Sequence, residues 1–185
     1  PQFDMHNIHD DSVHKSKNIC FIGSGHSDRC ILLSKINELC KLEKVSIDIF
    51  IYFPSAFVFW LKRIFRYKLP NDMLNYCSLI PLSSEGVVQG IMKSDAVLDI
   101  THPHQTGLTM RTIEAVGMNK KLITTNKEVI KYDFYSKDMV YIVDIEFPSL
   151  PPSSFFENPS SYDANTRKKY SLESWVSQII TDLPV

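Results

Sequence analysis

The sequence predicts an α/β fold: a Rossmann-like, doubly wound and mainly parallel sheet of about six strands, with helices on both faces. Short apolar runs alternate with segments of helical periodicity along the chain from residue 17 onward. Two of these runs lead directly into glycine-containing polar loops, and each loop precedes a helix. The chain has 185 residues, which is enough for one well-packed domain.

The first half of the chain supplies three strands and three helices. Strands are expected at 17–23, 45–53 and 77–82, because each is a short apolar run. A helix with apolar residues at helical spacing is expected over about 28–42, with Ser27 or Asp28 as its N-cap. Pro54 ends the second strand. Further helices are expected at 55–68 and at 84–93, the latter after a cap at Ser83 or Ser84.

The second half continues the alternation. Strands are expected at 96–100, 122–125 and 139–143, with a helix that Gly107 opens and Gly117 and Asn119 end. A helical turn is expected at 127–131, a Pro- and Ser-rich surface connection without helix at 147–165, and a last helix at 171–181. The expected strand order 3-2-1-4-5-6 would place both glycine loops side by side where the order reverses.

Composition excludes several classes of protein. Hydrophobic residues are 44% and charged residues 22%, and the net charge of -1 indicates no nucleic-acid partner. No signal peptide is visible. Residue 1 is Pro and residues 1–16 are polar without periodicity, so we expect a linker or N-terminal arm, then one domain over 17–185, in a fragment of a longer protein.

The cysteines at 20, 30, 40 and 77 fit neither a zinc nor a disulfide pattern, and we expect buried, reduced thiols.

The strongest candidate site is the junction between the strand at 96–100 and the helix that follows it. A helix N-terminus has unpaired N–H groups and a partial positive charge, and at the carboxyl end of a parallel strand it is suited to bind phosphate. Thr109 adds a hydroxyl and Arg111 a positive charge. Glu114 lies farther along the helix, where its carboxylate would accept hydrogen bonds from two ribose hydroxyls while the amides hold a diphosphate.

The loop before this helix is polar. Its candidate ligand-binding residues are His102, Gln105, Thr106, Gly107 and Leu108. His102 and His104 flank Pro103, and three interpretations stay open: a metal pair, a loop contact to a ligand, or structural roles. No third metal ligand is evident nearby, so we expect no metal.

The first glycine loop is a second candidate phosphate cradle. Gly23, Ser24 and Gly25 follow a strand and precede a helix. Asp28 stands where the dinucleotide-binding fingerprint needs its third glycine, so that match fails. In the alternative interpretation, the glycines only make a tight turn and Arg29 is solvated.

A family resemblance enters at the second junction. Gly-Leu-Thr-Met-Arg-Thr-Ile-Glu-Ala-Val-Gly at 107–117, followed by Lys-Lys-Leu-Ile-Thr-Thr-Asn at 120–126, resembles the donor-binding helix of glycosyltransferases with two facing Rossmann-like domains, the GT-B architecture. It is most similar to the bacterial group for lipopolysaccharide and capsular polysaccharide synthesis. The resemblance implies that this chain is the C-terminal donor-binding half of that architecture.

The resemblance also implies roles for single residues. Two glutamates eight positions apart mark many relatives, and the second contacts the ribose; by that resemblance, Glu114 is the ribose ligand. The first would fall at Thr106, where this sequence departs from the pattern, and Gln105 or Thr106 is the candidate replacement. Relatives carry a basic residue after the first glycine turn that faces the diphosphate, and Arg29 matches it.

The function implied is transfer of a hexose from a nucleotide diphosphate sugar, with UDP favoured as carrier, to a saccharide or lipid-linked acceptor. The resemblance implies no tightly bound cofactor and a cytoplasmic location. The general base would come from a preceding N-terminal domain, which would also supply half the walls of the site. We therefore expect this chain alone to bind nucleotide weakly and to transfer no sugar. Two alternatives stay open: a nicotinamide-dinucleotide-binding oxidoreductase domain, and a non-catalytic scaffold on a membrane surface.

The segment 55–68 combines aromatic and aliphatic residues with Lys and Arg. A basic aromatic helix is suited to an anionic membrane surface, which would give a peripheral contact on the inner face of the cell membrane. The alternative that the sequence favours is a helix packed on the sheet, whose Lys and Arg side chains reach out to solvent.

Overall fold

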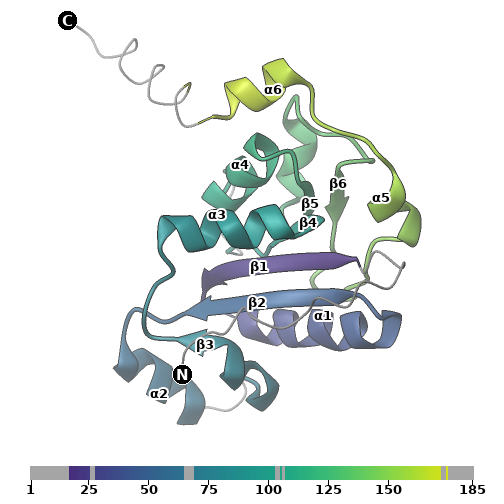
Figure 1. The fold of residues 1–185 in the computed structure, drawn as a ribbon. Coiled ribbons are helices and arrows are strands. Elements are labelled where there is room, and N and C mark those ends of the chain that lie inside the picture. The colour runs from purple at the N-terminus through teal and green to yellow at the C-terminus, as the bar shows by residue number, and fades with distance from the viewer. Residues whose placement is uncertain are drawn as a thin grey trace, which may run out of the picture.

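The computed structural model describes residues 17–25, 28–64, 69–102, 105, 107–171 and 174. They form one sheet with helices on both sides (Figure 1). The expected N-terminal arm at 1–16 lies outside the described residues, as does the last helix apart from its beginning. At that beginning, Ser171 Oγ accepts a hydrogen bond from Ser174 N at 3.2 Å, which is the expected N-cap contact.

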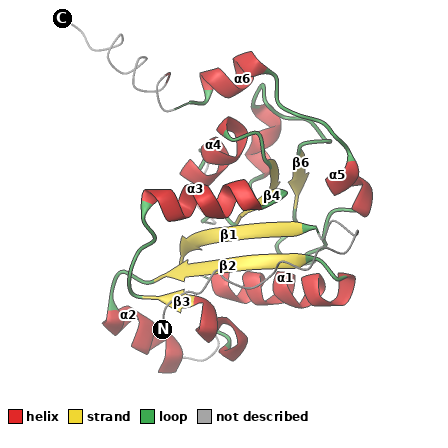
Figure 2. Cartoon of the chain, viewed as in Figure 1, coloured by secondary structure: helices red, strands yellow, loops and turns green. Residues whose placement is uncertain are grey.

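The sheet has six parallel strands in the order β3-β2-β1-β4-β5-β6, which confirms the predicted fold class and strand order. The strands are β1 (Asn18–Ser24), β2 (Ser46–Tyr52), β3 (Cys77–Ser78), β4 (Ala96–Asp99), β5 (Lys121–Thr124) and β6 (Val140–Ile142). Their alternation with helices is visible in Figure 2. Each predicted strand is present, and its ends lie within one residue of the predicted ones. The exception is β3, which ends at Ser78 and not at the predicted residue 82.

Two separate cores lie on the two faces of the sheet. Ile19 and Phe21 of β1 belong to one core, whereas Cys20 points to the other face, because successive side chains of a strand alternate. The first face is covered by α1 (Arg29–Glu43), the 3-10 helix η2 (Asn71–Tyr76) and α5 (Ser153–Glu157). The second is covered by α3 (Ser84–Lys93), α4 (Met110–Gly117) and the 3-10 helix η3 (Lys127–Lys131).

Side-chain caps begin α3 and α4, whereas Asp28, a predicted N-cap of α1, makes no side-chain cap hydrogen bond, and Ser27 lies outside the described residues. Ser83 Oγ accepts from Gly86 N at 3.1 Å and begins α3, as predicted. The predicted start of α4 at Gly107 is wrong: the helix begins at Met110, with Thr109 as N-cap. A Thr hydroxyl satisfies an otherwise unpaired N–H at the helix start and a glycine does not, so the cap decides the boundary. Asn119, with φ 56°, ends the turn after α4, in keeping with the expected stop.

Two connections differ from expectation. β3 is a short strand at the edge of the sheet. The chain leaves the sheet after it, and Leu79 and Ile80, which precede Pro81, are exposed to solvent. The connection at 147–165 is not free of helix. It contains α5, where Phe155 is buried in the first core, and it leads into α6 (Ala164–Lys169), which Asp163 caps.

The helix α2 (Ala56–Ile64) corrects a further expectation. None of its residues is buried, so the predicted packing of its apolar face on the sheet is wrong. Its contact with the core is through Phe59, whose ring centroid lies 5.3 Å from that of Phe53. Residues 65–68, the end of the predicted helix, lie outside the described residues. In the part of the chain that the structure describes, every helix is too short or too polar to span a bilayer.

The four cysteines are free thiols, as predicted. Cys20, Cys30 and Cys40 are buried and Cys77 is partly buried. Burial raises the pKa of Cys20, Cys40 and Cys77 to about 12. The thiolate is therefore disfavoured at neutral pH, which agrees with a packing role.

Candidate anion-binding site at the switch point

The strand order reverses between β1 and β4, and both candidate loops leave the sheet there. β1 runs into α1 on one face, and β4 runs into α4 on the other (Figure 1). β1 and β4 pair only at Ile19–Ala96 and Cys20–Val97, whereas β1 and β2 share seven residue pairs. The register of β1 and β4 therefore ends before their carboxyl ends, at the edge where open α/β sheets bind ligands.

Asp99 organises the start of α4. It is 5% exposed, and its Oδ2 accepts hydrogen bonds at 2.7 Å from both Thr109 Oγ1 and Thr112 Oγ1. Thr109 Oγ1 also accepts from Thr112 N at 3.0 Å. The Thr109 hydroxyl, expected to face a ligand, is thus engaged within the fold as donor and as acceptor. The N–H groups of Met110 and Arg111 also belong to the first turn, where the helix itself supplies no hydrogen-bond acceptor for them.

Sequence reasoning singled out neither Asp99 nor Thr112. The usable signal was a lone acid at the end of an otherwise apolar strand, since a buried carboxylate needs hydrogen-bond donors. Two threonines three residues apart at a helix start are such donors.

Two arginines lie in the first turns of the helices that follow β1 and β4, on opposite faces of the sheet. Arg29 is the first residue of α1; its Nη1 donates to Ser24 O at 3.1 Å, while its Nε is buried without a hydrogen-bond partner among the described residues. Burial lowers the pKa of Arg29, and the negative charge of Asp99 opposes this. Arg111 is in the first turn of α4, and its Nε is likewise buried and unpartnered within the described structure.

Glu114 is paired with Arg111 one turn earlier on α4. Arg111 Nη1 donates to Glu114 Oε2, and both side chains are largely shielded from solvent. Burial raises the pKa of Glu114, and the charge and hydrogen bond of Arg111 lower it. A ribose would therefore share this carboxylate with Arg111, and the ribose role stays a prediction.

The glycines have a packing role at the first loop. A Cβ on Gly25 would lie 2.1 Å from the Phe53 ring, and Gly25 N donates to Tyr52 O at 2.9 Å. A Cβ on Gly23 would lie 2.9 Å from the Phe21 ring and 3.2 Å from Arg29 Nη1. Gly25 thus does not present its N–H to a ligand, and Gly23 makes room for the Arg29 guanidinium.

The second loop is only partly described. Gln105 N donates to His102 O at 2.9 Å, and Gln105 is exposed. A Cβ on Gly107 would meet nothing within 4 Å, and Leu108 packs against the second core. The predicted residues Thr106 and His104 lie outside the described residues. Among the residues that are described, no three His, Cys, Asp or Glu side chains gather as metal ligands would.

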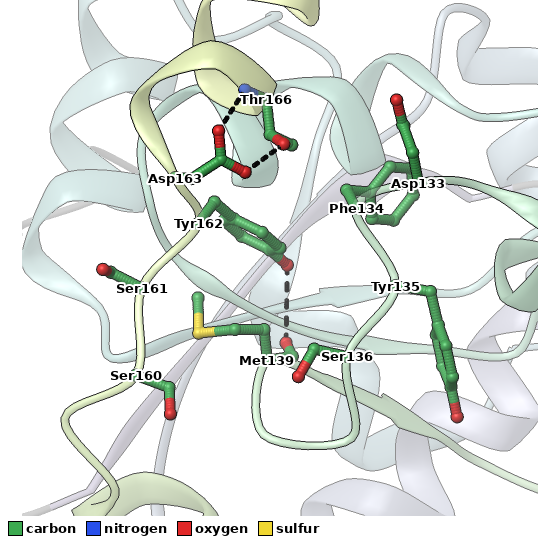
Figure 3. A pocket seen from close by; sticks show the side chains of 10 residues that line it. All are labelled: Asp133, Phe134, Tyr135, Ser136, Met139, Ser160, Ser161, Tyr162, Asp163 and Thr166. Atoms are coloured by element: carbon green, nitrogen blue, oxygen red, sulfur yellow. Dashed lines mark hydrogen bonds between the residues drawn. The ribbon is translucent and has the colours of Figure 1, made fainter.

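A cavity of about 280 Å³ lies elsewhere, between the 133–139 loop and the segment that leads into α6 (Figure 3). Two hydrogen bonds join residues of its lining: Tyr162 Oη donates to Met139 O at 3.5 Å, and Asp163 accepts from Thr166 N at 2.9 Å. Burial raises the pKa of Tyr162. No pattern in the sequence predicted this cavity.

Comparisons with known proteins leave the family open. No protein-family model matches the chain, and no curated protein matches it. What is established is a six-stranded parallel Rossmann-like α/β fold, compatible with nucleotide binding, in which the helices that follow β1 and β4 each have an arginine with a buried Nε in the first turn.

Proposed function

We propose that this chain is the donor-nucleotide domain of a GT-B-like glycosyltransferase of bacterial surface-polysaccharide synthesis. The observation that carries the proposal is the pair of buried Nε groups without a partner among the described residues, on Arg29 and Arg111 in the first turns of the helices that follow β1 and β4. Buried donors without acceptors are uncommon in folded proteins, and a diphosphate offers several anionic acceptors.

The reaction proposed is transfer of a hexose from a nucleotide diphosphate sugar to a saccharide or lipid-linked hydroxyl. Negative charge builds on the leaving diphosphate in the transition state. Arg29, Arg111 and the N–H groups at the start of α4 are suited to stabilise that charge, because a preorganised cationic site needs little rearrangement. Glu114 would bind the ribose, and we assign no general base to this chain.

The geometry of the first loop argues against the nicotinamide alternative. In dinucleotide-binding folds, the second glycine lets the pyrophosphate approach the backbone closely. Here the Phe53 ring fills that space beside Gly25, and Tyr52 O occupies the Gly25 N–H.

Calorimetry with UDP, GDP, CDP, ADP and NAD tests the proposal. We expect UDP or GDP to bind, and Arg29→Gln or Arg111→Gln to weaken binding by about 10- to 100-fold, as for hydrogen bonds to a charged group. Arg167→Gln is the matched control, because Arg167 is exposed on α6, away from the switch point. The proposal fails if no nucleoside diphosphate binds at millimolar concentration, or if NAD alone binds.

Glu114→Ala separates the ribose role from the phosphate role. Loss of its hydrogen bonds should weaken nucleotide binding by about 1.5–3 kcal/mol and leave binding of inorganic diphosphate less affected. Glu128→Ala is the control, because Glu128 pairs with Lys131 at the same i,i+3 spacing on η3. Equal nucleotide affinity of a folded Glu114→Ala variant and the parent would remove the ribose assignment.

A further inference from the structure

An apolar stripe on α2 faces solvent. Phe57, Trp60, Leu61 and Ile64, here called the α2 stripe, have the spacing i, i+3, i+4, i+7 and so share one face of the helix. Their side chains are 74%, 56%, 43% and 71% exposed, respectively. Single exposed apolar residues are ordinary, but four on one helical face mark a contact surface.

The opposite side of the helix explains why α2 holds its place. Phe59 packs edge to face on Phe53, and Phe53 in turn fills the space above Gly25. The helix is thus anchored to the core through Phe59, which Trp60 of the α2 stripe also contacts edge to face. Phe57 and Ile64 are the most exposed residues of the stripe, so they are the ones to change without disturbing a buried residue.

The helix that carries the stripe has charges of one sign only. Its charged residues are Lys62 and Arg63, and the described residues 49–64 contain no Asp or Glu, although the whole chain has a net charge of -1. The exposed guanidinium of Arg63 lies 5.2 Å from the centroid of the Trp60 ring. Apolar and aromatic residues beside Lys and Arg are typical of helices that lie in the interface of an anionic bilayer.

The α2 stripe belongs to the same edge of the sheet as the switch point. α2 follows the carboxyl end of β2, and Figure 1 shows it beside the ends toward which the β2 and β3 arrows point. Leu79 and Ile80, directly after β3, add exposed apolar surface to this edge.

We propose that the α2 stripe, together with Lys62 and Arg63 of the same helix, seats this domain on the surface of an anionic lipid bilayer. The apolar side chains enter the boundary between head groups and acyl chains, and the cations contact lipid phosphates. A second copy of the chain fits this surface less well, because pairing two stripes would bring two segments of the same positive charge together. The proposal does not depend on the nucleotide site.

The chain has two Trp residues, so Trp175→Phe leaves Trp60 as the sole indole reporter. Vesicles of phosphatidylcholine alone are compared with vesicles that also contain phosphatidylglycerol. We expect flotation and a blue shift of Trp60 emission with the anionic vesicles, and both should fall as salt is raised. Absence of flotation and of the shift would overturn the proposal.

Variants localise the contact. Phe57→Ser combined with Ile64→Ser should lower vesicle partitioning by about tenfold or more, because two apolar side chains no longer leave water. The control, Ile130→Ser combined with Phe147→Ser, changes two exposed apolar residues outside α2 and should bind as the parent does. Equal loss in both double variants, or no loss in either, would contradict the proposal.

Two further measurements separate the remaining outcomes. Both double variants should unfold at the temperature of the parent, since all four residues are exposed. Sedimentation without lipid should give a monomer. A dimer that Phe57→Ser dissociates would show that a second copy covers the stripe and would overturn the lipid assignment.

Discussion

The two strand–loop–helix junctions at the switch point share one plan, a strand, a glycine-containing loop and a helix, and differ in what holds their helices. At the β4–α4 junction, Thr109 caps the helix and donates to Asp99, so side chains fix the helix to its strand. At the β1–α1 junction, Asp28 makes no side-chain cap hydrogen bond, and Arg29 contacts the Ser24 carbonyl. One junction is held by a side-chain cap that is tied to its strand, whereas the other is held by backbone contacts and by an arginine that bonds to the loop carbonyl.

The largest effect is expected when the stability of Asp99→Ala is compared with that of Asp28→Ala. Asp99→Ala removes two hydrogen bonds to a buried carboxylate and should lower the free energy of unfolding by about 2–4 kcal/mol. Asp28→Ala, at an exposed position, should change it by less than about 0.5 kcal/mol. Urea denaturation measures both, and similar losses in the two variants would refute the contrast.

Gly25→Ala against Gly107→Ala compares the two loops. The new Cβ at 25 would overlap the Phe53 ring, and moving that ring should lower stability by about 1–3 kcal/mol. At 107 there is open space and no positive φ, so alanine should leave stability unchanged or slightly raise it. If Gly25→Ala unfolds at the parent's denaturant midpoint, the packing explanation for Gly25 is wrong.

Thr109→Ala sharpens the capping side of the comparison. Loss of the cap should lower the free energy of unfolding by about 0.5–2 kcal/mol. Thr109→Ser keeps the hydroxyl and should recover most of this loss, as thermal melts would show. A Ser variant no more stable than the Ala variant would mean that the threonine methyl, and not the cap, carries the effect.

The smallest expected effect is the pH dependence from Glu114. Burial holds its pKa above the ordinary value of 4.5, so the folded state binds the proton more tightly than the unfolded state does. Stability from this group is therefore present below pH 4.5 and is lost as the pH rises from there through the folded-state pKa.

Glu114→Gln does not titrate and serves as the reference for this effect. The free energy of unfolding of the parent minus that of Glu114→Gln should fall across this window and then level off. Denaturation curves at closely spaced pH values measure the difference. A difference that rises with pH would mean that Arg111 outweighs burial in setting the Glu114 pKa.

The fold was predictable because its signals are local and repeated. Each strand is an apolar run next to a turn or a helix start, and the reversal of strand order follows from sequential pairing around β1. Ser83 was predictable as a cap for the same reason, since capping depends on neighbouring residues. Phe155 was not, because α5 is held by burial of that side chain against strands distant in sequence.

The position of the candidate site in the fold was predictable, whereas its side-chain contacts were not. Strand ends and glycine loops marked the edge of the sheet, and they brought Arg29 and Arg111 into consideration. The partners of Asp99 depend on how α4 sits over β4, and the Phe53 ring above Gly25 depends on the neighbouring strand. Such contacts are set by tertiary packing, and no spacing along the chain encodes them.

The short ladder between β1 and β4 makes the sheet two three-stranded halves joined at a seam of two residue pairs. The edge strand β3 is also joined by two pairs, but among the interior strands β1 and β4 share the fewest, two against four for β4–β5 and seven for β1–β2. Amide hydrogen exchange should therefore reveal this seam as a boundary between two cooperative units. Arg29 belongs to one half and Arg111 to the other. A ligand that bridges both guanidinium groups would hold the two halves together and slow amide hydrogen exchange in both.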